Sequence, residues 1–215
     1  MYNAIKNFIR SIFSVIARAI HNVSGGKITP NMVTWIGTIA FLPIAWLIAN
    51  GYLIYAGFGV ILFGLFDTLD GELARLQKRQ NTFGMFLDSV TDRVKELLIY
   101  SGVALLFKYG GTIDSKIFGT MYLSEIYFWA IIALGLSLLT SYLNAWGEVA
   151  ISRANKSQST TNQELRGGFA PFEIRMTLLA VGLISNELLL VFMTISLLAA
   201  STVIDRFLRV KNRIG

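Results

Sequence analysis

The sequence has 215 residues, of which 54% are hydrophobic and only 15% are charged, a balance far more apolar than that of an average soluble domain. It contains no cysteine, so disulfides and thiolate metal sites are excluded, and a metal ion would need oxygen ligands or the single histidine, His21. The net charge of +6 matches the excess of lysine and arginine in cytoplasmic loops of membrane proteins, so no nucleic-acid partner is needed to explain it. The composition therefore predicts an integral membrane protein.

The N-terminal segment, residues 1–28, predicts a surface helix followed by a linker. Isoleucine and phenylalanine recur at helical spacing, while lysine, arginine and serine occupy the opposite face. Such an amphipathic helix lies in the membrane interface and does not cross the bilayer. The stretch "SGGKITPN" then ends the helix.

Six membrane-spanning helices are predicted after this segment, because apolar runs alternate with glycine, asparagine or charged breaks. The predicted spans are residues 31–50, 54–76, 84–108, 122–150, 172–185 and 188–208. The expected fold is an all-α integral membrane protein, with one domain over residues 1–215 and a six-helix bundle over 31–208.

The distribution of basic residues predicts the orientation. With the N-terminus in the cytoplasm, all of the 19 lysines and arginines except Lys108 and Lys116 fall on the cytoplasmic side. The chain is therefore expected in the cell membrane, with both termini in the cytoplasm. Asp114, Glu125 and Glu187 lie near the outer ends of the spans, where we expect them to be solvated.

Four aspartates lie at the cytoplasmic ends of the second and third predicted spans. Asp67 and Asp70 are three residues apart, and Asp88 and Asp92 are four apart, so each pair shares a helix face. The short connection between the two helices would bring the pairs into one cluster. A carboxylate at membrane depth costs about 2.5–3.5 kcal/mol, and like charges repel, so the cluster indicates bound divalent cations.

Oxygen ligands of this kind favour Mg²⁺, Mn²⁺ or Ca²⁺, as one ion or as two ions that share a ligand. Gly71, Gly84 and Ala74 leave room for a ligand beside the carboxylates, and Arg75 stands at the rim. Metal ions next to small residues and an arginine are what a pyrophosphate substrate requires.

The full spacing is Asp67-x2-Asp70-Gly71-x2-Ala74-Arg75-x8-Gly84-x3-Asp88-x3-Asp92, and it resembles the signature of the CDP-alcohol phosphatidyltransferases. The resemblance extends over nearly the whole chain. It implies that the hydroxyl of a small polar alcohol attacks the β-phosphorus of a CDP-linked lipid and releases CMP. Mg²⁺ or Mn²⁺ would be the cofactor.

The resemblance also assigns roles by position. Asp67, Asp70, Asp88 and Asp92 would form the metal site, with Asp88 and Asp92 catalytic and Asp92 the general base. The CDP group would be bound by a set of residues around the signature, namely Asp67, Gly71, Ala74, Arg75 and Gly84, together with Thr34 of "TPNMVT".

For the acceptor alcohol, the sequence is most similar to the branch of the family that uses inositol phosphate. Ser141 begins a segment typical of that branch, but Asn144 and Trp146 stand where basic residues are expected. Arg175 and Arg206 correspond by context to arginines that hold the phosphate of the acceptor. Glycerol 3-phosphate and serine remain alternative acceptors, and the lipid is diacylglycerol-based or archaeol-based.

Other functions are also compatible with acidic residues in a membrane. A divalent-cation transporter would use intramembrane carboxylates, but here the outer halves of the spans offer no polar route. An aspartyl protease needs only a pair of aspartates. The expected partners of the transferase are a CDP-lipid donor, a small polar alcohol, membrane lipid and, by family resemblance, a second copy of the chain in a homodimer.

Overall fold

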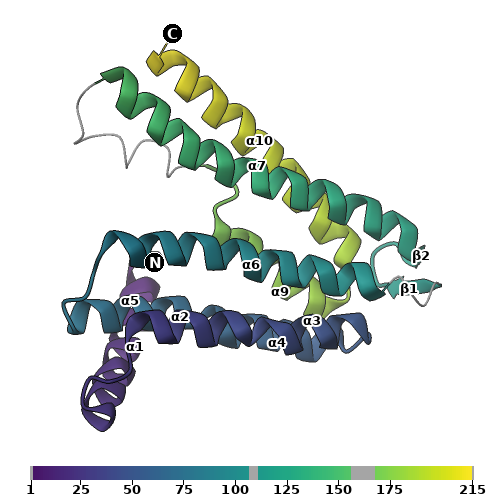
Figure 1. Cartoon of the computed structure of the whole chain (residues 1–215). Coiled ribbons are helices and arrows are strands. Elements are labelled where there is room, and N and C mark those ends of the chain that lie inside the picture. The colour runs from purple at the N-terminus through teal and green to yellow at the C-terminus, as the bar shows by residue number, and fades with distance from the viewer. Residues whose placement is uncertain (1, 107–110, 156–167, 215) are drawn as a thin grey trace.

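The computed structural model describes residues 2–106, 111–155 and 168–214, and helices make up most of them (Figure 1). The helices are, in chain order, α1 (Tyr2–Ser24), α2 (Pro30–Ile39), α3 (Phe41–Ala49), α4 (Leu53–Gly64), α5 (Phe66–Leu76), α6 (Thr82–Leu106), α7 (Leu123–Asn155), α9 (Phe172–Ser185) and α10 (Leu188–Ile214). Two short strands, β1 (Thr112–Ser115) and β2 (Gly119–Tyr122), lie between α6 and α7.

Each of the six predicted spans is helical. The first is divided into α2 and α3 at Ala40, and the second into α4 and α5 at Leu65. Helices α7 and α10 continue beyond the predicted ends at residues 150 and 208, to Asn155 and Ile214. Lys108 and the predicted end of the third span lie outside the described residues.

The helices form a bundle around one large apolar core (Figure 1). Helix α6 packs on α2 and α3, α4 packs on α9, and α7 and α10 form a closely packed pair. Phe41, Ile99 and Phe192, from α3, α6 and α10, are all fully buried in this core. The two halves of the chain are therefore held together by apolar packing, and α9 links them because it contacts both α4 and α10.

Within the described residues, four helical segments are long and apolar enough to cross a membrane: Pro30–Ala49, Leu53–Leu76, Leu123–Arg153 and Leu188–Ile214. Trp46, Phe58 and Leu197 on three of them have 58–68% of their surface exposed, as expected of side chains that face lipid. Helix α6 carries five charged residues among its first 15, and α9 has only 14 residues. Neither has the length and composition of an ordinary span.

The β1–β2 hairpin departs from the all-α prediction. The strands pair antiparallel, and Gly119 adopts φ +74° at the turn, a conformation that favours glycine. Glu187, at the start of α10, is 6% exposed and accepts hydrogen bonds from Ser115 Oγ (2.5 Å) and Lys116 N (2.6 Å). The prediction that Glu187 is solvated was wrong, because the hairpin folds over it and provides its donors.

Helix α1 packs against α5. One part of its apolar face is buried in this contact, and the other part is exposed on the surface of the protein. Ala17 is buried with Leu69 and Leu73 of α5, and Phe13 packs against the same cluster. Ile12 and Ile16 remain exposed, so the helix retains an apolar edge that suits a membrane interface.

Close backbone contact between α3 and α6 depends on Gly102. A Cβ atom at this position would lie 2.7 Å from Ala45 O and 3.0 Å from Ala45 Cα, which are backbone atoms that cannot move aside. We predict that Gly102→Ala lowers the free energy of unfolding by about 1–3 kcal/mol. Thermal unfolding in detergent measures this effect.

Gly135→Ala in α7 is the matched control, because a Cβ there meets no atom of the described residues within 4 Å. Alanine should leave stability unchanged or raise it by about 0.5–1 kcal/mol through helix propensity. Equal melting temperatures for the two variants would contradict the packing argument.

Candidate active site

The four aspartates lie on α5 and on the first turns of α6, and both helices pack against α2. Residues 77–81, which connect α5 to α6, are fixed by a hydrogen bond at each end. Gln77 Nε2 donates to Ile28 O at 2.8 Å, and Asn81 Oδ1 accepts from Gly84 N at 2.7 Å, which caps the N-terminus of α6. These local contacts set the direction in which the aspartates of α6 face α5.

Three of the carboxylates form one group that suits a metal ion. Oxygen atoms of Asp67, Asp70 and Asp88 all lie within 4.8 Å of one another. Asp70 is 8% exposed and accepts a hydrogen bond of 2.6 Å from Thr34 Oγ1, while Asp88 is exposed. The donor set is entirely oxygen, so it fits Mg²⁺ or Mn²⁺, and the exposed Asp88 leaves the group accessible from outside.

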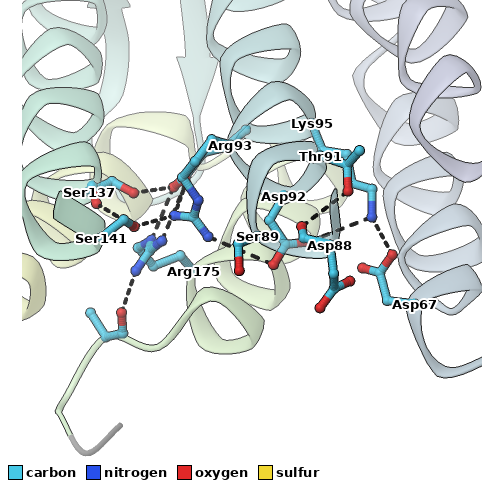
Figure 2. Close-up of polar contacts among 12 residues, drawn as sticks. Asp67, Asp88, Ser89, Thr91, Asp92, Arg93, Lys95, Ser137, Ser141 and Arg175 are labelled. Carbon is cyan, nitrogen blue, oxygen red and sulfur yellow. Dashed lines mark hydrogen bonds and ion pairs between the residues drawn. The ribbon is translucent and has the colours of Figure 1, made fainter. Parts of the chain in front are cut away.

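Asp92 lies outside this group of three and is placed between two cations (Figure 2). Its Oδ1 lies 3.7 Å from Lys95 Nζ, and its Oδ2 lies 3.9 Å from Arg93 Nη2. Oδ1 is buried and accepts no hydrogen bond from any residue that the structure describes. Three of the four predicted metal residues therefore form one group, and the metal role predicted for Asp92 stays a prediction.

Lys95 is the first site residue that the sequence prediction missed. Its side chain is fully buried, and its Nζ donates a hydrogen bond to Asp67 Oδ1 (Figure 2). A buried lysine is rare unless it is paired. The signal in the sequence was a lysine three residues after Asp92 inside a predicted span.

The residues predicted to bind the nucleotide surround the carboxylates of α5. Among the described residues, a Cβ atom at Gly71 would meet only Arg75 Nη2, at 3.8 Å, so the backbone there is open to a ligand. Arg75 is exposed and pairs with Glu72 at 2.5 Å. A Cβ atom at Gly84 would lie 3.3 Å from Asn81 Oδ1, so glycine at this position also protects the helix cap.

A second buried polar cluster has Glu96 at its centre. Glu96 is fully buried and accepts hydrogen bonds from Arg93 Nη1 (2.9 Å) and Arg175 Nε (3.0 Å) and from Ser137 Oγ. Arg93 also donates to Ser141 Oγ at 2.7 Å, and Arg175 donates to Ala170 O at 2.5 Å. The cluster joins α6, α7 and α9, and it brings together the predicted acceptor residues Ser141 and Arg175 (Figure 2).

Arg206, the third predicted acceptor residue, reaches the same region from α10. It is 6% exposed and donates to Thr140 O at 2.6 Å, one residue before Ser141. Asn144, one turn further along α7, has a buried Oδ1 without a hydrogen-bond partner among the described residues, and Trp146 is exposed.

The sequence prediction also missed Arg93 and Glu96. Both had a detectable signal, since they are charged residues of opposite sign, three apart, inside a predicted span. Their partners on α7 and α9 come from distant parts of the sequence, which sequence spacing cannot reveal.

Comparison with known proteins identifies the family. A model of the CDP-alcohol phosphatidyltransferases matches residues 27–204. The chain belongs to this family. As a CDP-alcohol phosphatidyltransferase it is a transferase, as the sequence predicted, and enzymes of this family depend on a divalent metal ion.

Among similar proteins, the phosphatidylinositol phosphate synthase of Cutibacterium acnes is 34% identical over 148 residues, which are 68% of this chain and 67% of that protein. The archaetidylinositol phosphate synthase of Pyrococcus horikoshii is 38% identical over 78 residues, 36% of this chain and 42% of that protein.

The phosphatidyltransferase fold also matches solved structures of the phosphatidylinositol phosphate synthase of Mycobacterium tuberculosis. The structure with CDP-DAG bound has a TM-score of 0.74 and 24% identity, and the match covers 93% of this chain and 94% of that chain. The complex with manganese and citrate gives a TM-score of 0.70 at 24% identity, with 94% and 90% covered.

The buried Glu96 cluster gives a stability prediction. Glu96→Gln removes the carboxylate from two largely buried guanidinium groups, so we expect the free energy of unfolding to fall by about 3–5 kcal/mol. Thermal unfolding in detergent tests this, with the exposed Glu125→Gln as a control that should change stability by less than about 0.5 kcal/mol. Equal melting temperatures for the two variants would show that Glu96 does not hold the cluster.

Proposed function

We propose that the protein transfers a phosphatidyl or archaetidyl group from a CDP-lipid to the hydroxyl of a small polar alcohol, with inositol phosphate as the preferred acceptor. CMP is the second product. The observation that carries this proposal is the group of Asp67, Asp70 and Asp88 carboxylates within 4.8 Å, contributed by two helices at the positions of the family signature. The names of the relatives from Cutibacterium acnes and Pyrococcus horikoshii support the choice of acceptor.

In this proposal Asp67, Asp70 and Asp88 hold the divalent ion. When bound, such an ion neutralises the phosphate oxygens of the donor and stabilises the departing CMP. Arg75 at the exposed edge of α5 binds the diphosphate, and the open backbone at Gly71 allows the nucleotide to approach closely. Thr34 fixes the orientation of Asp70 through its hydrogen bond.

Asp92 is the proposed general base. Its Oδ1 accepts the proton of the acceptor hydroxyl as the oxygen attacks the β-phosphorus, and the bond from that phosphorus to the oxygen bridging to the α-phosphate breaks. The lack of a hydrogen bond to Oδ1 from any described residue supports this role, because the capacity of this oxygen to accept a proton is not used by the protein.

The acceptor is proposed to bind between the Asp92 carboxylate and the arginines of the second cluster. Arg175 and Arg206 supply positive charge for its phosphate, and Ser141 supplies a hydroxyl group. Asn144 occupies a position where the inositol-phosphate branch has a basic residue. Glycerol 3-phosphate, which also carries a phosphate for Arg175 and Arg206, is the second candidate acceptor.

We also propose that all six helical segments cross the cell membrane, with both termini and the carboxylates on the cytoplasmic side. The positive-inside distribution of lysine and arginine supports this orientation. Arg93, Lys95 and Glu96 of α6 are paired within the protein, which lets an otherwise unsuitable helix lie at membrane depth. By family resemblance, the working unit is a homodimer.

The acceptor prediction is tested by CMP release from CDP-diacylglycerol by the purified protein in Mn²⁺ or Mg²⁺. Inositol phosphate, glycerol 3-phosphate, free inositol and serine are supplied one at a time. We expect inositol phosphate to stimulate release at least tenfold more than the others, and EDTA to abolish it. Stimulation by none of them, with either CDP-diacylglycerol or CDP-archaeol, would contradict the proposed reaction.

The base assignment predicts that Asp92→Asn lowers kcat about 10²–10⁴-fold with little change in the affinity for CDP-lipid. Asp114→Asn, an exposed aspartate beyond the other end of α6, is the control and should retain full turnover. Wild-type turnover in Asp92→Asn would rule out its role as the base.

A further inference from the structure

Thr202 of α10 lies one turn before Arg206 and on the same face of the helix. Its side chain has no exposed surface. The hydroxyl donates to Leu198 O at 2.7 Å, and it accepts from Phe169 N and from Ala170 N, each at 3.1 Å. A hydroxyl has one hydrogen to donate and two lone pairs, so the protein uses the whole hydrogen-bonding capacity of this one.

The two amides belong to the segment that leads into α9, residues 168–171. Pro171, the N-cap residue of α9, has no polar side-chain atom with which to cap the helix. A Cβ atom at Gly168 would lie 2.6 Å from Thr202 Cγ2, so glycine allows the segment to lie directly against the threonine. Contacts with α10, and not a side-chain cap on α9, therefore hold the segment in place.

The same segment holds the guanidinium group of Arg175. Nη1 donates to Ala170 O at 2.5 Å, while Nε and Nη2 donate to the two oxygens of Glu96 at 3.0 and 3.3 Å. The carboxylate fixes one edge of the planar group, and the carbonyl fixes the third nitrogen. Ala170 is fully buried and its amide is bound to Thr202, so the hydroxyl of Thr202 helps to determine where this carbonyl lies.

Helix α10 therefore acts on both arginines that are proposed to bind the phosphate of the acceptor. It carries Arg206, whose Nη1 donates to Thr140 O at 2.6 Å. It also holds Arg175 through Thr202 and Ala170. Guanidinium groups recognise phosphate by the geometry of their N–H groups, so the position of one arginine relative to the other matters for binding.

We propose that Thr202 is a positioning residue of the acceptor site. Its hydroxyl fixes Arg175 through residues 168–171, so that Arg175 and Arg206 are presented together to the phosphate of the acceptor alcohol. Thr202 acts through Arg175 and is not itself a ligand of the acceptor. The inference rests on the proposed function, since it assumes that the two arginines bind this phosphate.

The experiment measures CMP release by the purified full-length protein in detergent, with Mn²⁺, CDP-diacylglycerol and inositol phosphate. Thr202→Val keeps the shape of the side chain and removes the hydroxyl. We expect it to raise the KM for inositol phosphate about 3–10-fold, the loss expected from one hydrogen bond, while kcat and the KM for CDP-diacylglycerol stay within about twofold of the wild type. Thr202→Ser keeps the hydroxyl and should restore the wild-type KM.

Thr194→Val is the matched control on the same helix. Thr194 Oγ1 also donates to a backbone carbonyl four residues earlier, that of Leu190, at 2.7 Å, but it accepts no hydrogen bond from the described residues. This variant should keep the wild-type kinetic constants. Hydrogen–deuterium exchange of the peptide that contains Phe169 and Ala170 provides a second measurement. Thr202→Val should speed this exchange several-fold, and Thr202→Ser and Thr194→Val should leave it unchanged.

An unchanged KM for inositol phosphate in Thr202→Val, or an equal rise in the KM for CDP-diacylglycerol, would overturn the inference. Exchange at the wild-type rate in Thr202→Val, or a Thr202→Ser variant as impaired as Thr202→Val, would do the same. If Thr202→Val does not fold, Thr202→Cys replaces it, because a thiol is a weak acceptor, and the same changes are required. A wild type that inositol phosphate does not stimulate would overturn the proposed acceptor and this inference together, whereas an active wild type with an unchanged Thr202→Val KM overturns the inference alone.

Discussion

The need to balance charge inside an apolar bundle governs the active end of this enzyme. Charged groups alternate in sign from Asp67 to Lys95, Asp92, Arg93, Glu96 and finally Arg175, with contacts of 3.9 Å or less between successive members. Each charge would be costly alone in this surrounding, and each is compensated by its neighbours. The series runs from the proposed metal group to Arg175, a proposed acceptor residue, so the interactions that stabilise the fold also join the two halves of the proposed reaction.

Helix α6 is the element on which this series depends. Its capped N-terminus presents Asp88, Asp92 and Lys95 toward α5, and Arg93 and Glu96 toward α7 and α9. One helix can serve both sides because residues three or four apart share a face while adjacent residues point in different directions. The charge content that makes α6 a poor membrane span by composition also connects the proposed donor side to the proposed acceptor side.

The carboxylates at the two ends of the bundle differ in how many hydrogen bonds they accept from the protein. At the hairpin end, Glu187 accepts hydrogen bonds from Ser115 and from the backbone of Lys116 and Ile117, so its role there is structural. At the other end, Asp88 is exposed and Asp92 Oδ1 accepts no hydrogen bond from the described residues. Carboxylate oxygens that accept no hydrogen bond from the protein keep the capacity to bind a metal ion or a proton.

The sequence by itself determined the helical segments, the pairing of aspartates on helix faces and the family signature, because helical periodicity and residue spacing are local properties. It also predicted that Ser141 and Arg175 belong to one region. Only the tertiary structure decided that Lys95 joins Asp67 to Asp92, that Glu96 binds Arg93 and Arg175, and that Glu187 is buried under a hairpin. The contacts between helices join residues 28 positions apart for Lys95 and Asp67 and 79 positions apart for Glu96 and Arg175. Their existence depends on how the helices pack and not on any local pattern.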